Sequence, residues 1–447
     1  MNRLTLIPVS IILLSVMLIQ FYNVYWPFYT SMLSYLVYLY FEEDLYKWVT
    51  KNFILQNKTT ADDLPSRVQH DARRQATYPV VYPNTWYHFA DTEELSPGKV
   101  MEVRALNQTF VLWRKSDGTP VCQDAYCLHL GANLAVGGKV KDDCIECPFH
   151  LWKFDSEGCI KEIPYIDNPH KCPTHSKLKT YPCVDYCGWI LVFFHADDKA
   201  PEFEPPKYVP QQFKDEDYMP HLKWDIGFVQ LNCIDWCDQV GDHTHFNTLH
   251  KDMYIPWTLM LLPDWVLNLF PIGITHKVTT FMGDDKDWVN KVERTGWGEV
   301  SKQLMYFHDD AGITWGGKVL ETTMAQTTEM YIGPALIVFH IPFTIGIIKV
   351  FVSTTPVEGG SIMRVRTWVD GRVKKSYWIQ WIAWFLTGIS ASQLMSDIII
   401  MCNKIRLKKP ILQPFDGPYN RVNAWIKQFY SESSGKIGPE VPYKNDW

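Results

Sequence analysis

The chain has 447 residues, of which 47% are hydrophobic and 15% aromatic, a composition that supports two or three folded domains and excludes an intrinsically disordered protein. Its formal net charge of −6, without long basic runs, argues against nucleic acid as a partner. Ten of its 11 cysteines lie between Cys122 and Cys237, and this odd, clustered set favours metal chemistry in a reducing compartment over a disulfide framework.

The first predicted element is a membrane anchor. No charged residue occurs within residues 4–41, a run longer than the roughly 20 residues that one helix needs to cross a bilayer. Pro27 is a candidate break, giving either a hairpin or one span plus an interfacial segment. The alternative is a cleaved signal peptide, but the exit of the apolar run at Gln20-Phe21-Tyr22 offers no small-residue cleavage site. We therefore expect residues 1–45 to form a transmembrane anchor and residues 46–84 a linker.

Two folded domains are expected to follow. Residues 85–200 alternate short β-type runs with turn signals such as Ser116-Asp117-Gly118, which predicts a small all-β domain. The proline-rich segment 201–210 is a plausible linker at the start of the second domain. For residues 201–447 we expect an α+β domain, with long strand-like stretches that run through 265–281, 313–330 and 347–369. A hairpin is expected at Glu358-Gly359-Gly360, and a helix from 376 to about 405.

The sharpest motif lies in the all-β part: Cys127-Leu128-His129, then, after 17 residues, Cys147-Pro148-Phe149-His150. Two thiolates and two imidazoles are the ligands of a [2Fe–2S] centre in which two cysteines hold one iron and two histidines the other. Each loop here supplies one ligand of each kind. A structural zinc site would use the same residue types, but zinc fingers usually keep the cysteine pair together and the histidine pair together.

A second metal site is indicated further along, where Asp242, His245 and His250 form a D-x2-H-x4-H pattern. An O2-activating Fe(II) takes two histidines and one carboxylate and keeps open positions. The five-residue step between His245 and His250 turns about 140° on a helix, so the helix must bend or end there for the rings to converge. Asp242 is the candidate to hold a ligand histidine and to pass the electron from the cluster. His243 is a competing ligand.

The run Cys147-Pro148-Phe149-His150-Leu151-Trp152-Lys153-Phe154-Asp155 resembles the ring-hydroxylating oxygenase branch of the Rieske family. Leu151 stands where that branch usually has glycine. Ala132 and Phe149 occupy the places of two extra, disulfide-forming cysteines in respiratory Rieske proteins, which implies a lower cluster potential here. The resemblance also favours His245 over His243 and implies that the iron's carboxylate lies on a helix near the C-terminus.

Asp397 is the candidate for that carboxylate. It is the lone acid in the apolar stretch Met395-Ser396-Asp397-Ile398-Ile399-Ile400. An unpaired buried carboxylate costs several kcal/mol, so a metal is a good reason for its presence. The alternatives are a helix N-cap, or a salt bridge to Lys404 or Arg406.

The anchor, both metal motifs and the tail Asp416-Gly417-Pro418-Tyr419-Asn420-Arg421 together resemble the cholesterol 7-desaturases, known as the Neverland family, over about residues 30–435. The resemblance implies a helix-grip-type catalytic domain and conversion of cholesterol to 7-dehydrocholesterol for steroid hormone biosynthesis. It also implies an endoplasmic reticulum membrane location with the catalytic domains facing the cytosol. Related oxygenases pair one subunit's cluster with the next subunit's iron, so a homotrimer is implied, with Asp242 at the contact.

Two other functions remain open from the sequence. One is a steroid or lipid hydroxylase on the same scaffold, and the other is a membrane electron-transfer protein that uses the cluster alone. The sequence contains no GxGxxG fingerprint and no plant-type ferredoxin spacing, so a separate NAD(P)H-dependent reductase is expected. The expected cofactors are a [2Fe–2S] cluster and a mononuclear Fe(II), and the other expected partners are a sterol, O2 and the membrane.

Overall fold

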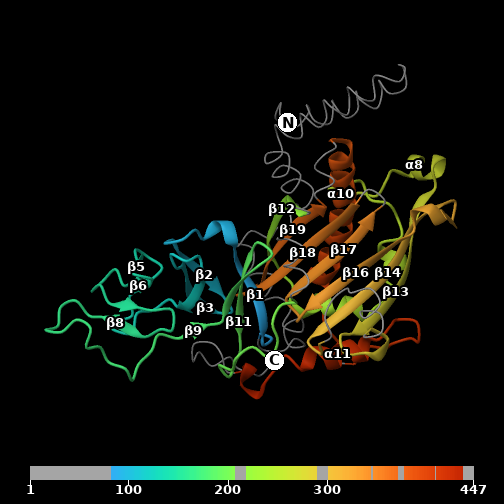
Figure 1. The fold of residues 1–447 in the computed structure, drawn as a ribbon. Helices are drawn as coiled ribbons and strands as arrows, with labels where there is room; N and C mark the ends of the chain where they lie inside the picture. The colour runs from blue at the N-terminus through green and yellow to red at the C-terminus, as the bar shows by residue number, and fades with distance from the viewer. Residues whose placement is uncertain are drawn as a thin grey trace.

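The computed structural model describes residues 82–206, 218–288, 301–343, 346–370, 377–407 and 409–435. The expected anchor and most of the expected linker lie outside these residues. The described residues form two regions, a smaller one made of short strands and a larger one built on a single broad sheet (Figure 1).

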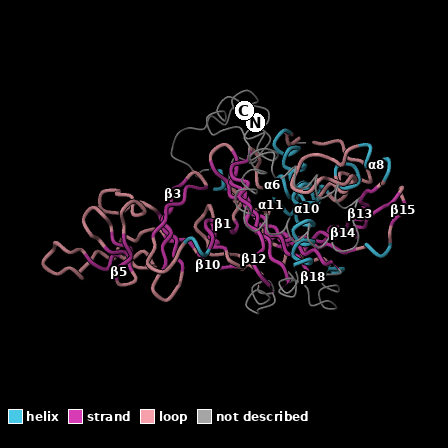
Figure 2. The backbone as a smooth tube through the Cα atoms, turned by 90° about the horizontal axis from the view of Figure 1, so that it is seen from above, coloured by secondary structure: helices cyan, strands magenta, loops and turns pink. Residues whose placement is uncertain are grey.

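The smaller region consists of three antiparallel sheets, which confirms the all-β expectation for this part of the chain. Their orders are β1-β11-β10, β2-β3-β4-β9 and β5-β6-β7-β8. The strands are β1 (Thr85–Asp91), β2 (Val100–Ala105), β3 (Gln108–Arg114), β4 (Pro120–Asp124), β5 (Lys139–Lys141), β6 (Cys144–Glu146), β7 (Lys153–Phe154), β8 (Ile160–Glu162), β9 (Thr180–Tyr181), β10 (Cys183–Tyr186) and β11 (Trp189–Phe194). The β5–β8 sheet forms the tip of this region, away from the larger one (Figures 1 and 2).

The larger region is organised by an eight-stranded antiparallel sheet of order β12-β19-β18-β17-β16-β14-β13, with β15 paired to β14. The strands are β12 (Tyr218–Val229), β13 (Ile272–Met282), β14 (Leu304–Trp315), β15 (Lys318–Val319), β16 (Ala325–Ile332), β17 (Leu336–Phe343), β18 (Gly346–Val357) and β19 (Gly360–Asp370). The helices are α6 (Ile234–Val240), α7 (Phe246–Leu249), α8 (Asp264–Leu269), α10 (Tyr377–Asn403) and α11 (Tyr419–Lys427).

The middle of this sheet is covered on both faces. Successive side chains of a strand point to opposite sides, so neighbouring residues enter two different cores. Phe307 and Tyr331 pack with buried residues of α6, α10 and α11 in one core. Their neighbours Tyr306 and Met330 pack instead with β1 and β11 in a second core. Helices α6, α10 and α11 therefore cover one face of the sheet, and the sheet that contains β1 covers part of the other face.

Strand β1 ties the two regions together through buried polar contacts. Asp91 accepts hydrogen bonds from Arg366 of β19, at 3.0 Å from Nε and 2.6 Å from Nη2. His88 Nδ1 lies 2.9 Å from the hydroxyl of Ser353 on β18. Burial lowers the pKa of His88 to about 4, while hydrogen bonding to Asp91 acts in the opposite direction. The joint is thus built around a neutral imidazole.

Two of the three expected strand stretches were wrong in part. In 265–281, α8 occupies the first residues and the strand begins only at Ile272. In 313–330, β14 ends at Trp315, because Gly316 and Gly317 adopt positive φ values of 54° and 77° and turn the chain. The hairpin between β18 and β19 and the long helix α10 are confirmed.

Helix α10 is long and apolar enough, over Ile382–Asn403, to cross a membrane by length and composition alone. That segment is 61% buried inside the protein and packs against the sheet, and a core helix passes the same test. It therefore gives only weak evidence of a membrane span.

Candidate metal centres and pocket

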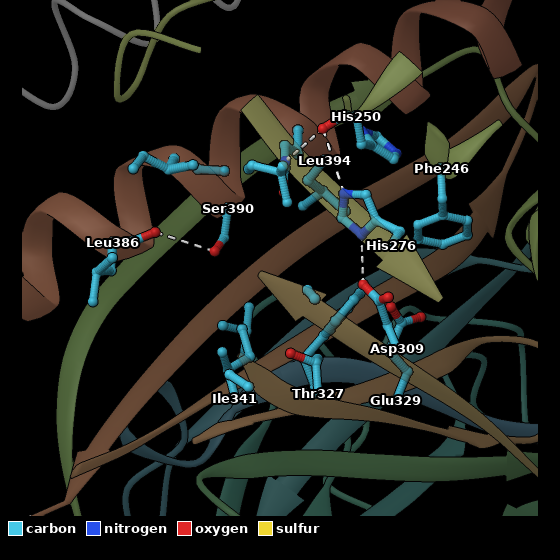
Figure 3. A pocket seen from close by; sticks show the side chains of 18 of the residues that line it. Phe246, His250, His276, Asp309, Thr327, Glu329, Ile341, Leu386, Ser390 and Leu394 are labelled. Carbon is cyan, nitrogen blue, oxygen red and sulfur yellow. Dashed lines mark hydrogen bonds and ion pairs between the residues drawn. The ribbon is translucent and has the colours of Figure 1, made fainter. Parts of the chain in front are cut away.

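A cavity of about 650 Å³ lies between α10 and the strands β13 to β19, within the range typical of small-molecule sites (Figure 3). The helix contributes Leu386, Ser390 and Leu394, and the strands contribute apolar residues such as Ile341. Most of the lining is apolar, and the polar side chains include His250, His276, Asp309, Glu329 and Asp397.

The structure brings His245, His250 and Asp397 together beside this cavity. One potential ligand atom from each of the three lies within 4.8 Å of the others. His245 immediately precedes α7 and His250 immediately follows it, so the four-residue helix ends between them, as the five-residue spacing requires. Asp397 reaches them from α10, and its Oδ1 lies 3.0 Å from His250 Nε2.

The orientation of these side chains fits a metal. His245 Nδ1 donates to the backbone carbonyl of Asp242 at 2.6 Å, which leaves Nε2 as the basic nitrogen. That Nε2 is buried, with no hydrogen-bond partner among the described residues. Burial lowers the pKa of His245, with Asp397 opposing the shift, so the ring is neutral and able to ligate. Two imidazoles and a carboxylate are the donor set of a non-haem Fe(II) site.

The competing assignments are not supported by the contacts. His243 points its Nε2 at the hydroxyl of Thr280, 2.9 Å away. Asp397 lies inside α10, not at its N-cap. Lys404 and Arg406 both pair with Asp238, Arg406 Nε at 2.9 Å, and Asp397 instead accepts from Gln239 Nε2 at 3.2 Å.

Asp242 contacts the candidate ligand His245 through its backbone: the carbonyl oxygen of Asp242 lies 2.6 Å from His245 Nδ1, whereas its carboxylate Oδ2 lies 3.9 Å away. The carboxylate is 48% exposed and accepts a hydrogen bond from the backbone N–H of Thr244. The side chain therefore remains accessible from outside the chain, close to the proposed iron ligands.

The four residues of the cluster motif lie in two matching turns, one between β4 and β5 and one between β6 and β7. Gly131 N donates to Cys127 O at 2.9 Å, and Leu151 N donates to Cys147 O at 3.1 Å. Both thiols are buried, and the rings of His129 and His150 approach to 4.7 Å between centroids.

Burial, with a further contribution from Cys147, raises the pKa of Cys127 to about 11. As a free thiol Cys127 would stay protonated, and cluster iron is the kind of cation that binds a cysteine as its thiolate. His129 Nδ1 is buried and has no hydrogen-bond partner among the described residues. This donor set fits a Rieske-type cluster.

Leu151, which stands where glycine is usual in the branch the motif resembles, has a φ of 59°. The left-handed conformation costs a non-glycine residue roughly 1–2 kcal/mol. The positive φ of this turn position explains why glycine is usual there. The Leu151 side chain is not one of the candidate cluster ligands.

The sequence did not reveal a second polar group in the cavity. His276 Nδ1 lies 2.7 Å from Asp309 Oδ2, and Glu329 lies on the neighbouring strand with its Oε2 3.4 Å from the Tyr331 hydroxyl (Figure 3). Burial first, and then Asp309 and Asp397, raise the pKa of Glu329 well above its ordinary value, so it is a neutral acid. The feature that could have revealed this group is the presence of acidic residues at strand positions that face the cavity. Those positions can be identified only when the strand register is known.

Comparison with known families identifies both regions. The family model of the Rieske [2Fe-2S] domain matches residues 85–182, and that of the 3-ketosteroid 9alpha-hydroxylase C-terminal domain matches residues 192–430. Cholesterol 7-desaturase of Caenorhabditis elegans is 31% identical over 375 residues, covering 82% of this chain and 81% of the relative. Cholesterol 7-desaturase of Drosophila melanogaster is 27% identical, covering 96% and 94%. Dicamba monooxygenase shares the fold, with a TM-score of 0.52 at 16% identity, covering 78% of this chain and 98% of that structure.

Proposed function

Because this chain belongs to the Rieske oxygenases, and among them to the family of the cholesterol 7-desaturases, we propose that it converts cholesterol to 7-dehydrocholesterol. The reaction removes the hydrogens at C7 and C8 of the sterol. One O2 is reduced to two waters with two electrons from a separate NAD(P)H-dependent reductase, two protons, and the two hydrogens removed.

One observation carries this proposal: a two-histidine, one-carboxylate set opens onto a deep and mainly apolar cavity. His250 and Asp397 are both lining residues of the cavity and members of the metal-ligand set. A membrane electron-transfer protein that used only the cluster would have no need for this arrangement. A cavity of about 650 Å³ is also of the size that a four-ring lipid needs.

The residues of the chain have separable roles in this reaction. Cys127, His129, Cys147 and His150 would hold the cluster, and His245, His250 and Asp397 would hold the iron. When bound, these groups supply electron storage and O2 activation. The apolar walls from α10 and the sheet exclude water and orient the sterol against the metal-binding corner. Glu329 holds a proton within the same cavity, since its burial disfavours the charged form.

Sterol profiling tests the proposed activity and separates it from hydroxylation. Cells supplied with cholesterol and expressing the chain should accumulate a product lighter by two hydrogens, with the conjugated diene absorbance of 7-dehydrocholesterol. An Asp397→Ala chain expressed to the same level is the control and should give none. A product heavier by one oxygen would instead establish a hydroxylase.

We also propose that residues 1–45 anchor the chain in the endoplasmic reticulum membrane, with the catalytic domains facing the cytosol. The support is the absence of charge across residues 4–41. The chain should stay in the membrane pellet at high pH and high salt, and protease added outside intact microsomes should degrade its folded domains. Protection from that protease would place the domains in the lumen.

A trimer is proposed for electron transfer between subunits. In one chain, the β5–β8 tip that carries the cluster loops lies far from α10 (Figure 1). Exposed apolar side chains surround the cluster loops, among them Leu130, Phe149 and Leu151. A second exposed apolar side chain, Phe415, adjoins the Asp242 segment, where Thr244 Oγ1 donates to Phe415 O at 3.1 Å. Contact between these two surfaces would bring one subunit's cluster close to the next subunit's iron.

Mixing two inactive variants tests the trimer. Cys147→Ser removes the cluster and Asp397→Ala removes the iron site, so neither is active alone. Co-assembled in one membrane, they should regain partial activity, because some contacts join an intact cluster to an intact iron site. A fully inactive mixture with proven co-assembly would point to electron transfer within each chain.

A further inference from the structure

The polar end of the cavity contains a buried carboxylate oxygen that lacks a partner. Asp309 is 6% exposed, and its Oδ2 is engaged by His276 Nδ1 at 2.7 Å. Its other oxygen, Oδ1, is buried and has no hydrogen-bond partner among the described residues, although Asp309 lines the cavity. Figure 3 shows Asp309 beside Glu329 and Thr327, on the strand side of the cavity.

An unsatisfied buried acceptor of this kind is uncommon and destabilising, so it calls for a donor from elsewhere. No described neighbouring side chain is seen to donate a hydrogen bond to it. Glu329 makes its contact with the hydroxyl of Tyr331, and the amide of Gln326 donates to Asp310 at 2.8 Å. A ligand that enters the cavity can supply the donor that Asp309 lacks.

His276 fixes this acceptor relative to the metal-binding segment. Its Nδ1 holds Asp309, and its Nε2 lies 3.4 Å from the backbone carbonyl of His250. One imidazole thus links the unpartnered oxygen to a proposed iron ligand. A ligand that donates to Asp309 is held at a defined place relative to the reacting centre.

We propose that Asp309 Oδ1 accepts a hydrogen bond from the 3β-hydroxyl group of the sterol and makes the site selective for 3-hydroxysterols. This inference rests on the proposed function. Cholesterol has a single hydroxyl, and four bonds separate C3 from C7. Anchoring that hydroxyl therefore restricts where C7 lies. A 3-ketone has no hydrogen to donate, and its oxygen would face the carboxylate, so a 3-ketosteroid is disfavoured at the same position.

The test compares three ligands on the full-chain holoenzyme in lipid nanodiscs: cholesterol, cholest-5-ene, which lacks the hydroxyl, and cholest-4-en-3-one. Binding is measured anaerobically without reductant, so that no turnover occurs. Wild-type protein should bind cholesterol about 10–100-fold more tightly than either analogue, the range that a lost buried hydrogen bond gives.

Asp309→Asn keeps the side-chain volume and the acceptor for His276 but turns a donor amide toward the cavity. It should weaken cholesterol binding only by a few-fold, roughly, because the hydroxyl can accept from the amide and only the charge-assisted bond is lost. It should tighten binding of the ketone, whose oxygen can now accept a hydrogen bond. Asp310→Asn is the matched control: it removes the adjacent charge on the same strand, and Asp310 does not line the cavity. Its ligand preferences should equal those of the wild type.

Two outcomes would overturn the proposal. Equal binding of cholesterol and cholest-5-ene to wild-type protein would show that the hydroxyl makes no such contact, and this measurement does not depend on any variant folding. Parallel weakening of all three ligands by Asp309→Asn would show a merely structural role. If cholesterol is bound with the expected preference but is not desaturated on reduction, the proposed function fails and the hydroxyl contact stands.

Discussion

The two metal-binding regions of this chain are built in opposite ways. The proposed cluster ligands come from two neighbouring turns of one small region, and exposed apolar side chains such as Phe149 surround them. The proposed iron ligands flank α7 or lie on α10, far apart in sequence, and His250 and Asp397 are only 3% and 7% exposed. The difference follows from their tasks. An electron-transfer centre has to be approached by partners, whereas O2 activation needs a cavity from which water is excluded.

The largest expected effect separates the two regions by substitution. Asp397→Ala should abolish turnover and lower the metal content by about one iron per chain, because the facial ligand set loses its carboxylate. Its [2Fe–2S] absorption and electron paramagnetic resonance signals should be unchanged. Cys147→Ser, in contrast, should abolish the absorption and electron paramagnetic resonance signals of the cluster. Normal activity of Asp397→Ala would show that another acid ligates the iron.

Asp242→Asn probes the junction between the two regions. Both metals should be retained, since the backbone carbonyl and not the carboxylate of Asp242 holds His245. The exposed carboxylate lies at the proposed contact with the neighbouring subunit. Electron arrival at the iron should slow by about 10–100-fold, the change that loss of one hydrogen bond to a charged group across that contact gives. Rapid mixing of reduced cluster with O2 and substrate measures this rate. An unchanged rate with both metals present would remove Asp242 from the electron path.

A smaller effect concerns the joint between β1 and the large sheet. The pKa of His88 is about 4 in the folded chain, lowered chiefly by burial, against an ordinary value near 6.5. As the pH falls, His88 is therefore protonated in the unfolded chain before it is protonated in the folded chain. The contribution of His88 to the free energy of unfolding is fully present above pH 6.5, and it should decrease by about 3 kcal/mol on acidification to pH 4.

His88→Asn should flatten this part of the stability profile, measured by denaturant unfolding between pH 4 and 7. Exposed His170→Gln is the control and should leave the profile unchanged. If His88→Asn leaves the slope as steep as in the wild type, the imidazole is not buried in its neutral form at the joint.

The smallest expected effect is at the cluster turn. Leu151→Gly should stabilise the holoprotein by about 1 kcal/mol, because glycine adopts the left-handed conformation without a steric penalty. Leu130→Gly is the matched control, an exposed leucine of the other cluster turn whose φ is not positive, and it should not stabilise. The comparison is made by thermal unfolding with the cluster intact. Destabilisation by Leu151→Gly would mean that the side chain contributes more packing than the backbone loses.

The sequence was most informative where ligands are local. Cys127 to His150 span one short stretch, so spacing alone indicated a cluster with mixed ligands. The helix that ends between His245 and His250 followed from helical geometry in the same way. Strand boundaries in the large region were less accessible. Exposed apolar residues such as Trp265, Leu269 and Trp315 extend the apolar runs of the neighbouring strands, so short runs of this kind do not distinguish a helix or a turn from a strand.

Only the tertiary structure decided which polar groups share the cavity. Asp397 was selected from the sequence as an unusual buried acid, but its approach to His250 depends on how α10 packs across the sheet. His276, Asp309 and Glu329 carried no sequence signal, since single polar residues in strands are ordinary. They converge because β13, β14 and β16 are adjacent in the sheet, with a register that places their side chains on one face. Spacing along the chain was therefore enough to select the candidate ligands of each local motif. Strand order and helix packing determined the cavity, because its walls come from segments that meet only on folding.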